Sequence, residues 1–369
     1  MTAPSSTRSS VPRGPIVNSL KSGQLPRLIE LYTVIGALLV SAGILALMGR
    51  LNVVGELVLS AIVYLVAIGV ISSIVENRRK ATDRVIRGLV TVAFLLALAP
   101  LVSTLATVVI RGIGEINWTF ISTTSAHVFN PKTLVVTTTT GALQAIVGTL
   151  IITGIAALIS IPIGILTAIY LVEYAQGGNW LSRTVTFLVD VMTGIPSIVA
   201  GLFAFSLFSL LFGPKAFSGF SASIALSVLM IPIVVRSSEE MLKLVSLELR
   251  EASYALGVSK FSTITKIVLP TAIAGLVTGV MLAIARVIGE TAPIFMAASF
   301  TDNFNSNAFS GPMQTLPVMA YTGYKFPSTD IQGSIDSAWG AALLLIILVV
   351  ILNLIARIVA RVFAPKGLR

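Results

Sequence analysis

Arg286 and Glu290 are the residues whose types and spacing best suit chemistry, because they lie four positions apart in an otherwise apolar run. A guanidinium group can offer an oxyanion two parallel hydrogen bonds. A charge in a membrane-length segment costs roughly 3 kcal/mol, so it is usually paired or functional. On one continuous helix this spacing places both side chains on one face. Two interpretations stay open: mutual neutralisation, or an anion ligand, Arg286, whose strength Glu290 tunes while accepting a substrate proton.

Thr291 and Arg236 complete the set that we assign to a substrate path. Thr291 directly follows Glu290, whereas Arg236 ends a predicted apolar span and is either an anchor at the membrane face or a cation at the inner end of the path. Gly279 and Ala283 fall on the same heptad stripe as Arg286. Small residues there either leave room for an ion or let a second helix pack closely.

The composition identifies the elements that must hold these residues as membrane helices. Of the 369 residues, 55% are hydrophobic and only 11% are charged, against about 25% charged in soluble domains. Since a bilayer core of about 30 Å needs roughly 20 apolar residues of helix, we predict an all-α polytopic membrane protein with about eight transmembrane helices. The predicted spans are 28–48, 53–75, 87–110, 141–171, 185–212, 221–235, 271–298 and 338–362. The fourth and fifth spans are long and contain Pro162 and Pro196, which predicts a tilt, a kink or a break there.

The basic residues predict the orientation of these spans. Nineteen of the 25 Lys and Arg residues fall in one alternate set of connecting segments, five fall in the other, and Arg286 lies within a span. Because basic residues are retained on the cytoplasmic side, both termini are predicted to be cytoplasmic. A helix running straight from Pro270 would carry Arg286 about 24 Å along its axis. Arg286 would then lie in the outer half of the membrane.

The remaining segments differ in character. Residues 1–27 are basic and rich in Ser, Pro and Gly, and we expect a disordered cytoplasmic tail without a cleaved signal peptide. Residues 237–270 mix acidic and basic residues with apolar ones at helical spacing, which predicts short amphipathic helices at the membrane face. Glu173 and Asp190 lie near the inner ends of predicted spans, and we expect both carboxylates to be hydrated.

Several classes of function are excluded by the residues that the chain lacks. It has no cysteine and one histidine, so no metal site built on Cys or clustered His is expected. The sequence contains no GxxxxGK[ST] loop, so we expect no ATP hydrolysis by this chain. The net charge is +10, but the basic residues lie beside the long apolar runs and form no basic stripe, so no nucleic-acid partner is expected.

The loop before Pro270 carries a resemblance to a known family. Glu251-Ala252-Ser253, three residues, Gly257, nine residues, Ile267, one residue and Leu269-Pro270 resemble the EAA loop of ATP-binding-cassette (ABC) importer permeases. Ser253 replaces an alanine of that pattern, a small residue for another. In that family the loop forms a coupling helix that docks on the cytoplasmic ATPase. A short helix with a glycine turn at Gly257 and a proline stop at Pro270 can be pushed as a rigid unit. The resemblance therefore implies ATPase coupling for Glu251, Ala252, Ser253, Gly257, Leu269 and Pro270.

The next helix narrows the resemblance, because Arg286 and the run from Gly289 to Pro293 are similar to the R-x-x-GETAP signature of the A-type permease in phosphate-specific importers. The resemblance implies a type I permease core of six helices over 81–369, with the coupling loop at 237–270 and an N-terminal helix pair, 28–80, outside the family pattern. It also implies two copies of a cytoplasmic ABC ATPase that use ATP and Mg²⁺, a homologous C-type permease and an extracytoplasmic phosphate-binding protein. No cofactor is expected on this chain.

Three alternatives remain. The nearest is an ABC permease for another oxyanion, such as sulfate, molybdate or phosphonate. An ion-coupled secondary transporter would show internal repeats and more buried carboxylates, and it would not need the EAA loop. A membrane enzyme would need a clustered His, Cys or Asp constellation that the sequence does not contain.

Overall fold

The computed structural model describes residues 25–26, 28–49, 52–130, 135–175, 179–214 and 216–363, with the side chains of 126–139 and 362–363 left out. The predicted tail, 1–27, lies outside the described residues except for Leu25 and Pro26. The chain forms two compact units, 1–104 and 105–369, whose boundary falls inside a single helix. We describe each unit by itself.

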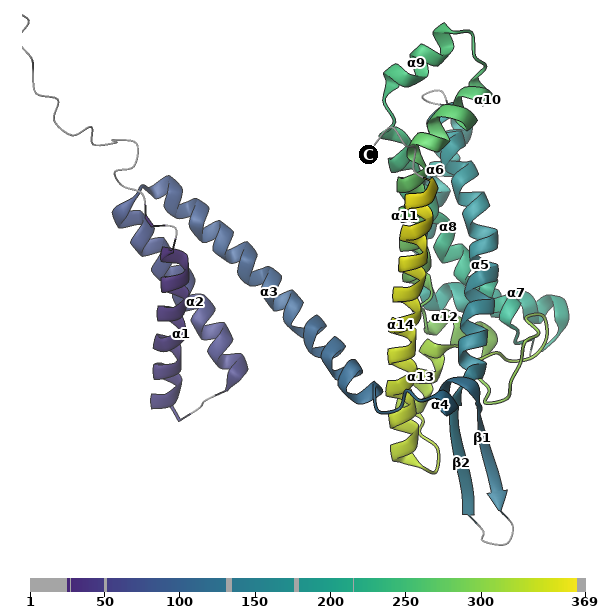
Figure 1. The fold of residues 1–369 in the computed structure, drawn as a ribbon, viewed down its shortest axis with the longest axis horizontal. Helices are drawn as coiled ribbons and strands as arrows, with labels where there is room; N and C mark the ends of the chain where they lie inside the picture. The colour runs from purple at the N-terminus through teal and green to yellow at the C-terminus, as the bar shows by residue number, and fades with distance from the viewer. Residues whose placement is uncertain are drawn as a thin grey trace, which may run out of the picture. The chain divides into compact units, whose positions relative to one another are not determined.

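The first unit is built from three long helices, α1 (Ile29–Leu47), α2 (Val53–Val75) and α3 (Arg78–Gly112), the last of which continues into the second unit (Figure 1). The side chain of Asn52 caps α2 by accepting a hydrogen bond from the backbone N–H of Val54 at 3.1 Å. Glu76 ends α2, and its carboxylate binds Arg84 of α3 across the turn. The predicted division at 80/81 stays a prediction; the compact units divide later, after Thr104.

The core of the second unit is α8 (Gly219–Lys243), which packs between α5 (Leu143–Ile169) and α11 (Leu269–Val287). Ile152 of α5, Leu226 and Met230 of α8 and Ala283 of α11 are fully buried in one cluster. Glycines allow this close packing: a Cβ at Gly279 would lie 2.7 Å from the Oγ atom of Ser237, and one at Gly275 would clash with Met241. The small-residue stripe on α11 therefore serves helix packing against α8.

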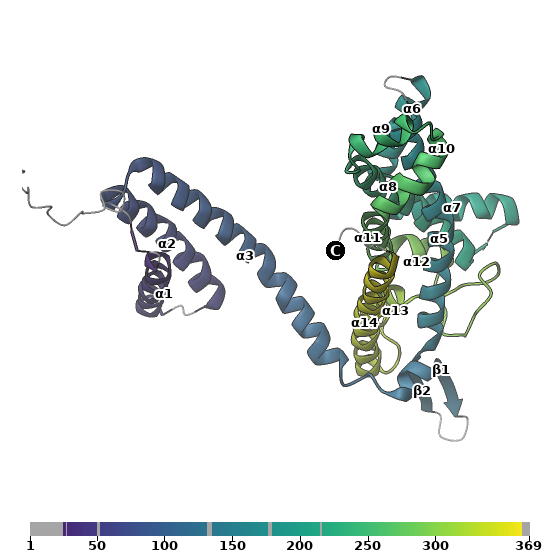
Figure 2. The same cartoon turned by 45° about the horizontal axis from the view of Figure 1, so that its top comes forward.

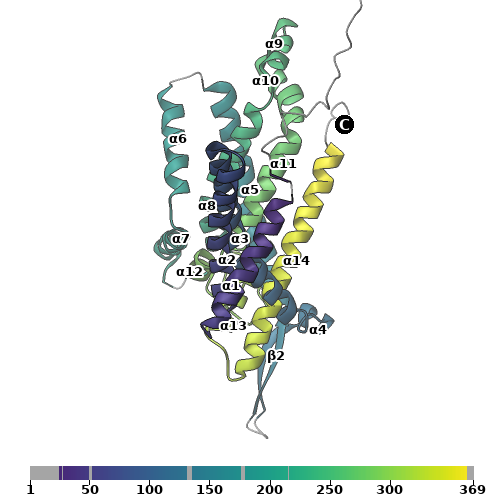
Figure 3. The same ribbon diagram turned by 90° about the vertical axis from the view of Figure 1, so that its left-hand side faces the viewer.

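The other elements of this unit lie around that core. They are α4 (Trp118–Ser122), β1 (Thr124–Asn130), β2 (Val135–Ala142), the π-helical turn η1 (Tyr170–Tyr174), α6 (Trp180–Thr193), α7 (Ser197–Phe212), α9 (Leu247–Ala255), α10 (Lys260–Thr263), the π-helical turn η2 (Ile264–Val268), α12 (Ala292–Ala298), α13 (Leu316–Lys325) and α14 (Ile331–Phe363). Strands β1 and β2 form an antiparallel hairpin. Figures 1 and 3 show α9 and α10 at the opposite end of the unit from this hairpin.

Seven helices within the described residues are long and apolar enough to cross a membrane, and the bent pair α6–α7 makes an eighth span if it is counted as one. The prediction of an all-α polytopic membrane protein is confirmed. The chain bends by 104° between α6 and α7, and Figure 2 shows α7 running out to the side of the bundle. The cause is Pro196, which disfavours a helical conformation at Ile195 and starts the next helix.

Two predicted spans differ from the structure in their bounds. Of the alternatives predicted at Pro162, a break is ruled out, because α5 continues past Pro162 into η1. The predicted sixth span, 221–235, is too short, since α8 runs two turns beyond Arg236. The predicted seventh span, 271–298, is not one helix: α11 ends at Val287, and α12 starts at Ala292.

Candidate functional site

The break between α11 and α12 sets the position of the predicted substrate-path residues. Pro293 lies in the first turn of α12 and has no N–H with which to bond the carbonyl of Gly289, so a continuous helix would lose that bond and strain its backbone. Gly289 itself is a poor helix former. The backbone N–H of Glu290 instead donates to the carbonyl of Val287 at 3.1 Å in a tight turn. Arg286 therefore lies in the last turn of α11, and Glu290 lies outside that helix.

This break removes the shared helix face on which mutual neutralisation of Arg286 and Glu290, one of the two open interpretations, depended. The two residues do not share a helix face, and none of the ion pairs among the described residues joins them. Arg286 is exposed, and Glu290 is partly buried. Both charges remain free to interact with a substrate or with another subunit.

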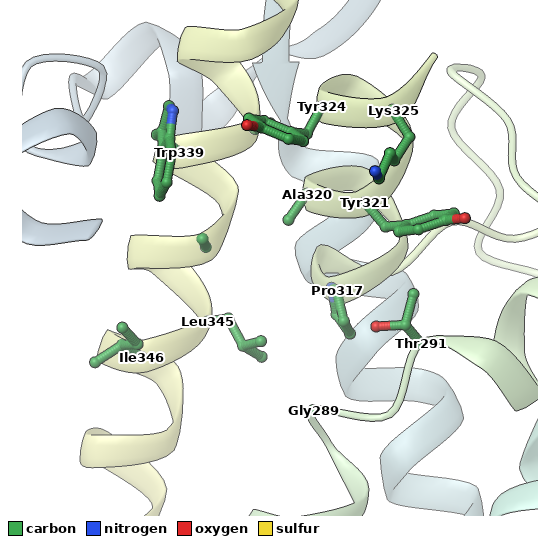
Figure 4. A pocket seen from close by; sticks show the side chains of 12 residues that line it. Gly289, Thr291, Pro317, Ala320, Tyr321, Tyr324, Lys325, Trp339, Leu345 and Ile346 are labelled. Carbon is green, nitrogen blue, oxygen red and sulfur yellow. The ribbon is translucent and has the colours of Figure 1, made fainter. Parts of the chain in front are cut away.

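Thr291 lies at the edge of a cavity of about 500 Å³ that α13 and α14 enclose with the α11–α12 turn. Figure 4 shows Tyr321 and Lys325 on α13, Leu345 and Ile346 on α14, and Gly289 beside Thr291. Apolar and aromatic side chains make up most of the wall, and Lys325 supplies the cation. Arg286 and Glu290 do not line this cavity. Sequence reasoning missed Lys325 because its position beside the turn depends on the packing of α13, which no motif marks.

Trp339 closes the cavity on the α14 side. The guanidinium of Arg111 lies 5.3 Å from the centre of its ring, and Tyr324 meets it edge to face at 6.1 Å. Such contacts hold a large aromatic side chain in one orientation. The indole N–H of Trp339 is buried and has no hydrogen-bond partner within the described part of the chain.

Arg236 belongs to a network of charges at the far end of α8. Its guanidinium donates to Asp190 of α6, and to the carboxylate of Glu239 at 3.0 Å. Glu239 also accepts from Lys243 at 2.7 Å. The expectation of a hydrated Asp190 holds only in part, because its carboxylate is exposed yet paired. Two carboxylates thus occupy Arg236, which ties α6 to α8.

The predicted coupling segment folds into α9 and α10, joined by a turn at Gly257. Gly257 has φ of 73°, a left-handed conformation that glycine adopts without strain, and the N–H of Val258 donates to the carbonyl of Ser253 to close the helix. The hydroxyls of Ser253 and Thr263 are buried and lie 2.8 Å apart. This bond fixes α9 against α10. Glu251 and Ala252 face outward.

Arg250 connects α9 to the rest of the unit, and sequence reasoning missed its partners. Its guanidinium donates to the carboxylate of Glu173 in η1 at 2.9 Å and to the backbone carbonyl of Leu242 at 2.8 Å, and it also reaches the carbonyl of Val245. The side chains of Arg250 and Glu173 are 12% and 5% exposed. The expectation that Glu173 is hydrated is wrong, because the folding of α9 onto η1 covers it.

Leu269 and Pro270 do not stop a helix as a proline stop would. The helical path from Lys260 continues through η2 into α11, where Pro270 occupies the first turn. The π-helical turn before it changes the hydrogen-bonding pattern where the proline cannot donate. Among the described residues, no cluster of three or more His, Cys, Asp or Glu lies where it could hold a metal ion.

The chain is a multi-pass membrane permease in architecture, and residues 160–368 match the family described as "Binding-protein-dependent transport system inner membrane component". It belongs to that family. It is 43% identical over 270 residues to the phosphate transport system permease protein PstA 1 of Mycobacterium tuberculosis (strain CDC 1551 / Oshkosh), covering 73% of this chain and 86% of that protein.

Two further comparisons extend this similarity. The phosphate transport system permease protein PstA of Haemophilus influenzae (strain ATCC 51907 / DSM 11121 / KW20 / Rd) is 36% identical over 269 residues, which cover 73% of this chain and 90% of that protein. Among solved structures, the inward-facing MetNI methionine ABC transporter aligns with a TM-score of 0.49 and 21% identity over 60% of this chain and 96% of that chain.

Proposed function

We propose that this chain is the A-type transmembrane permease subunit of an ATP-driven ABC importer that moves inorganic phosphate into the cell. The observation that carries the proposal is Arg286, a cation on the last turn of an apolar helix that no described carboxylate neutralises. Its relatives named as phosphate transport permeases support the choice of substrate. An ABC permease for sulfate, molybdate or phosphonate is the alternative that the experiment below tests.

The chemistry of phosphate fits the two charges at the helix break. At neutral pH phosphate is an anion that still carries a proton, so it needs a cationic donor and can also donate a hydrogen bond itself. Arg286 supplies a planar pair of N–H donors. Glu290 is not ion-paired with Arg286, so its carboxylate can accept a hydrogen bond from the substrate's O–H. The same carboxylate would repel sulfate, which has no proton to offer, so selectivity arises from repulsion as well as attraction.

Thr291 and Arg236 take different parts in this proposal. Thr291 offers a hydroxyl at the edge of the cavity, beside the helix break. Arg236 is held by Asp190 and Glu239, so we assign it to anchoring α6 on α8 at the inner end of the path rather than to binding the ion directly. Phosphate passing this end would meet a cation whose charge is already balanced.

The coupling segment is proposed to dock on a cytoplasmic ATPase. Leu247, Leu256 and Phe261 are exposed large apolar residues around α9 and α10, and Glu248 and Glu251 lie beside them. Apolar anchors with a polar rim are typical of protein interfaces. The bonds of Ser253 and Arg250 make the segment a rigid unit that can transmit a displacement to α5 and α8.

The complete importer proposed here has more subunits than this chain. Two copies of the ATPase would use ATP and Mg²⁺, a homologous C-type permease would complete the path, and an extracytoplasmic binding protein would deliver phosphate. This chain would bind no cofactor and catalyse no reaction. Transport would then consist of rigid-body rocking of helices that exposes Arg286 to each side in turn. The proposed topology has both termini in the cytoplasm.

The test is uptake of phosphate by the chain reconstituted with its candidate partners. Arg286→Gln should lower ATP-driven phosphate uptake at least tenfold, since a hydrogen bond to a charged group contributes about 1.5–3 kcal/mol, while assembly and basal ATP hydrolysis are retained. Arg357→Gln, which removes an exposed cation of α14, is the control and should leave uptake unchanged. Uptake that persists after Arg286→Gln and Glu290→Gln, or sulfate uptake at the same rate, would refute the phosphate assignment. Loss of assembly in Arg286→Gln would make that residue structural.

A further inference from the structure

The first unit contains two neighbouring cavities that the proposed transport function does not use. One, of about 740 Å³, is almost entirely apolar and is lined by residues that include Val34, Leu38, Tyr64, Gly88, Leu95 and Ala99. The other, of about 470 Å³, is polar and is lined by Leu25, Glu30, Glu76, Lys80, Asp83, Arg84 and Arg87. Both lie wholly within residues 1–104.

The two cavities are stacked end to end along the same helices. On α1, Glu30 lines the polar cavity, and Val34, one turn later, lines the apolar one; on α3, Arg84 and Gly88 have the same relation. Tyr64 stands at the junction. A Cβ at Gly88 would lie 3.1 Å from the Tyr64 ring, and Tyr64 is within electrostatic reach of Glu30 and Arg84. An occupant can therefore extend from one cavity into the other.

Two cations of the polar cavity, Lys80 and Arg87, are left weakly paired or unpaired by the ion pairs that the described residues form within it. Arg84 satisfies the acids that face it, because it binds Glu76 and lies 3.0 Å from the carboxylate of Glu30. Arg87 is 72% exposed, and its guanidinium lies 3.9 Å from the carboxylate of Glu30, the longest ion pair of the group. Lys80 makes no ion pair with another described residue. The cavity lining itself is balanced, with three basic and three acidic side chains. The adjoining segment 76–87 has five basic residues against two acidic ones, so the field at the mouth of the cavity attracts anions.

We propose that these cavities form a binding site for an anionic phospholipid. Its phosphate lies against Arg87 and Lys80, and an acyl chain lies in the apolar cavity between α1, α2 and α3. A cluster of basic residues beside the end of membrane helices is a setting that binds anionic headgroups. From Gly88 to Ser103 the lining of α3 extends about 22 Å at 1.5 Å per residue, enough for the chain of one leaflet in a core of about 30 Å. The proposal does not depend on which ion the permease moves.

The headgroup is tested with the full chain, delipidated in detergent and titrated with phosphatidylglycerol or phosphatidylcholine while native mass spectrometry counts bound lipid. Phosphatidylglycerol should be retained in preference to phosphatidylcholine. Arg87→Gln and Lys80→Gln should each weaken phosphatidylglycerol binding about fivefold, the loss expected for one basic residue near an anionic lipid. Arg79→Gln is the matched control: it removes a charge from the same segment but does not line the cavity, and it should change binding less than twofold.

The acyl-chain half is tested by filling the apolar cavity. Ala99→Phe places a ring in it and should weaken phosphatidylglycerol binding at least fivefold, whereas Ala93→Phe, on an exposed position of α3 that does not line the cavity, should have no effect. Equal occupancy by the two lipids, preference for phosphatidylcholine, or equal effects of Arg79→Gln and Arg87→Gln would overturn the proposal. So would an Ala99→Phe variant that keeps its lipid and loses a partner permease, because a helix would then be the occupant.

Discussion

Glu76 is the carboxylate most strongly held by hydrogen bonds at the start of α3. Its side chain is 2% exposed and accepts from the guanidinium of Arg84 at 2.9 and 3.0 Å, from the hydroxyl of Ser72 at 2.8 Å and from the backbone N–H of Leu25 at 3.0 Å. The bond to Arg84 is the largest of the effects that lower the pKa of Glu76 from 4.5 to about 2. Donors favour the ionised form, so the turn between α2 and α3 depends on a charged Glu76.

This pKa predicts how the stability of the first unit varies with pH. Because the folded-state pKa lies below the unfolded one, the stabilisation is complete above about pH 4.5 and is lost as the pH falls toward 2. The thermal unfolding midpoint of the chain in detergent should therefore fall from pH 6 to pH 3. Glu76→Gln should have a lower midpoint at pH 6 and a flatter profile, whereas Glu248→Gln, at an exposed position of α9, should follow the native curve. Identical profiles for the two variants would contradict the role of Glu76.

Residue types could be predicted from the sequence better than residue pairs. A lone arginine in an apolar span is conspicuous, and the spacing of the loop motif placed Gly257 at a turn that the structure contains. The partner of Arg250 could not be found this way, because Glu173 is 77 positions away and belongs to another helix. The shared helix face assumed for Arg286 and Glu290 is absent for a local reason, the glycine and proline that interrupt the helix.

At the scale of elements, α9 is joined to the membrane helices by few contacts, and Arg250 makes the strongest of them. It binds η1 at the end of α5 and the last carbonyls of α8 at the same time. A force on α9 would therefore reach two helices of the core together. Exposed cations such as Lys243, 61% exposed in its pair with Glu239, cannot act this way because water competes for them.

Arg250→Ala is predicted to separate ATP hydrolysis from transport. The substitution leaves Glu173 buried without its partner, a change that costs roughly 3–5 kcal/mol, and it frees α9 from α5 and α8. In the reconstituted importer we expect ATP hydrolysis to continue while phosphate moved per ATP falls at least fivefold. Lys243→Gln is the control, since Glu239 keeps Arg236 as a partner, and its coupling ratio should match the native one. An unchanged ratio in Arg250→Ala would show that α9 transmits force by another route.

Helix ends are predictable where a single residue forbids continuation and less so where neighbours compensate. Pro196 breaks its span because Gly194 before it adds no helical preference. Pro162 and Pro270 have the same chemistry and do not end their helices: the π-helical turn η2 directly precedes Pro270, and α5, which contains Pro162, packs along α8. Such compensation is tertiary, so neither the periodicity nor the hydropathy of the segment contains it.

At the scale of the whole molecule, the proposed importer requires each segment to lie on the correct side of the membrane. The coupling segment must face an ATPase, and the segment between α12 and α13 must face the opposite side, where a binding protein would act. In the second unit α9 and α10 lie at the end opposite the β1–β2 hairpin, which agrees with this requirement (Figure 1). The bent pair α6–α7 decides the number of crossings, because the termini share a side only if it crosses.

The absence of cysteine allows this topology to be measured with single introduced cysteines. In intact cells expressing the chain without its partners, a membrane-impermeant maleimide should label Phe309→Cys, 72% exposed in the segment before α13. It should not label Asn77→Cys or Leu256→Cys until the membrane is permeabilised. The reason is the bias of basic residues toward the segments that contain Asn77 and Leu256.

The decisive pair flanks α6 and α7. Asn179 precedes α6 and Pro214 follows α7, and both are exposed. If the bent pair crosses, Asn179→Cys is protected and Pro214→Cys is labelled in intact cells, because α8 must then begin outside to end at the coupling segment inside. Protection of both positions would make α6–α7 a re-entrant pair. The chain would then have seven crossings with its termini on opposite sides, and either the N-terminal unit or the coupling segment would face away from the cytoplasm.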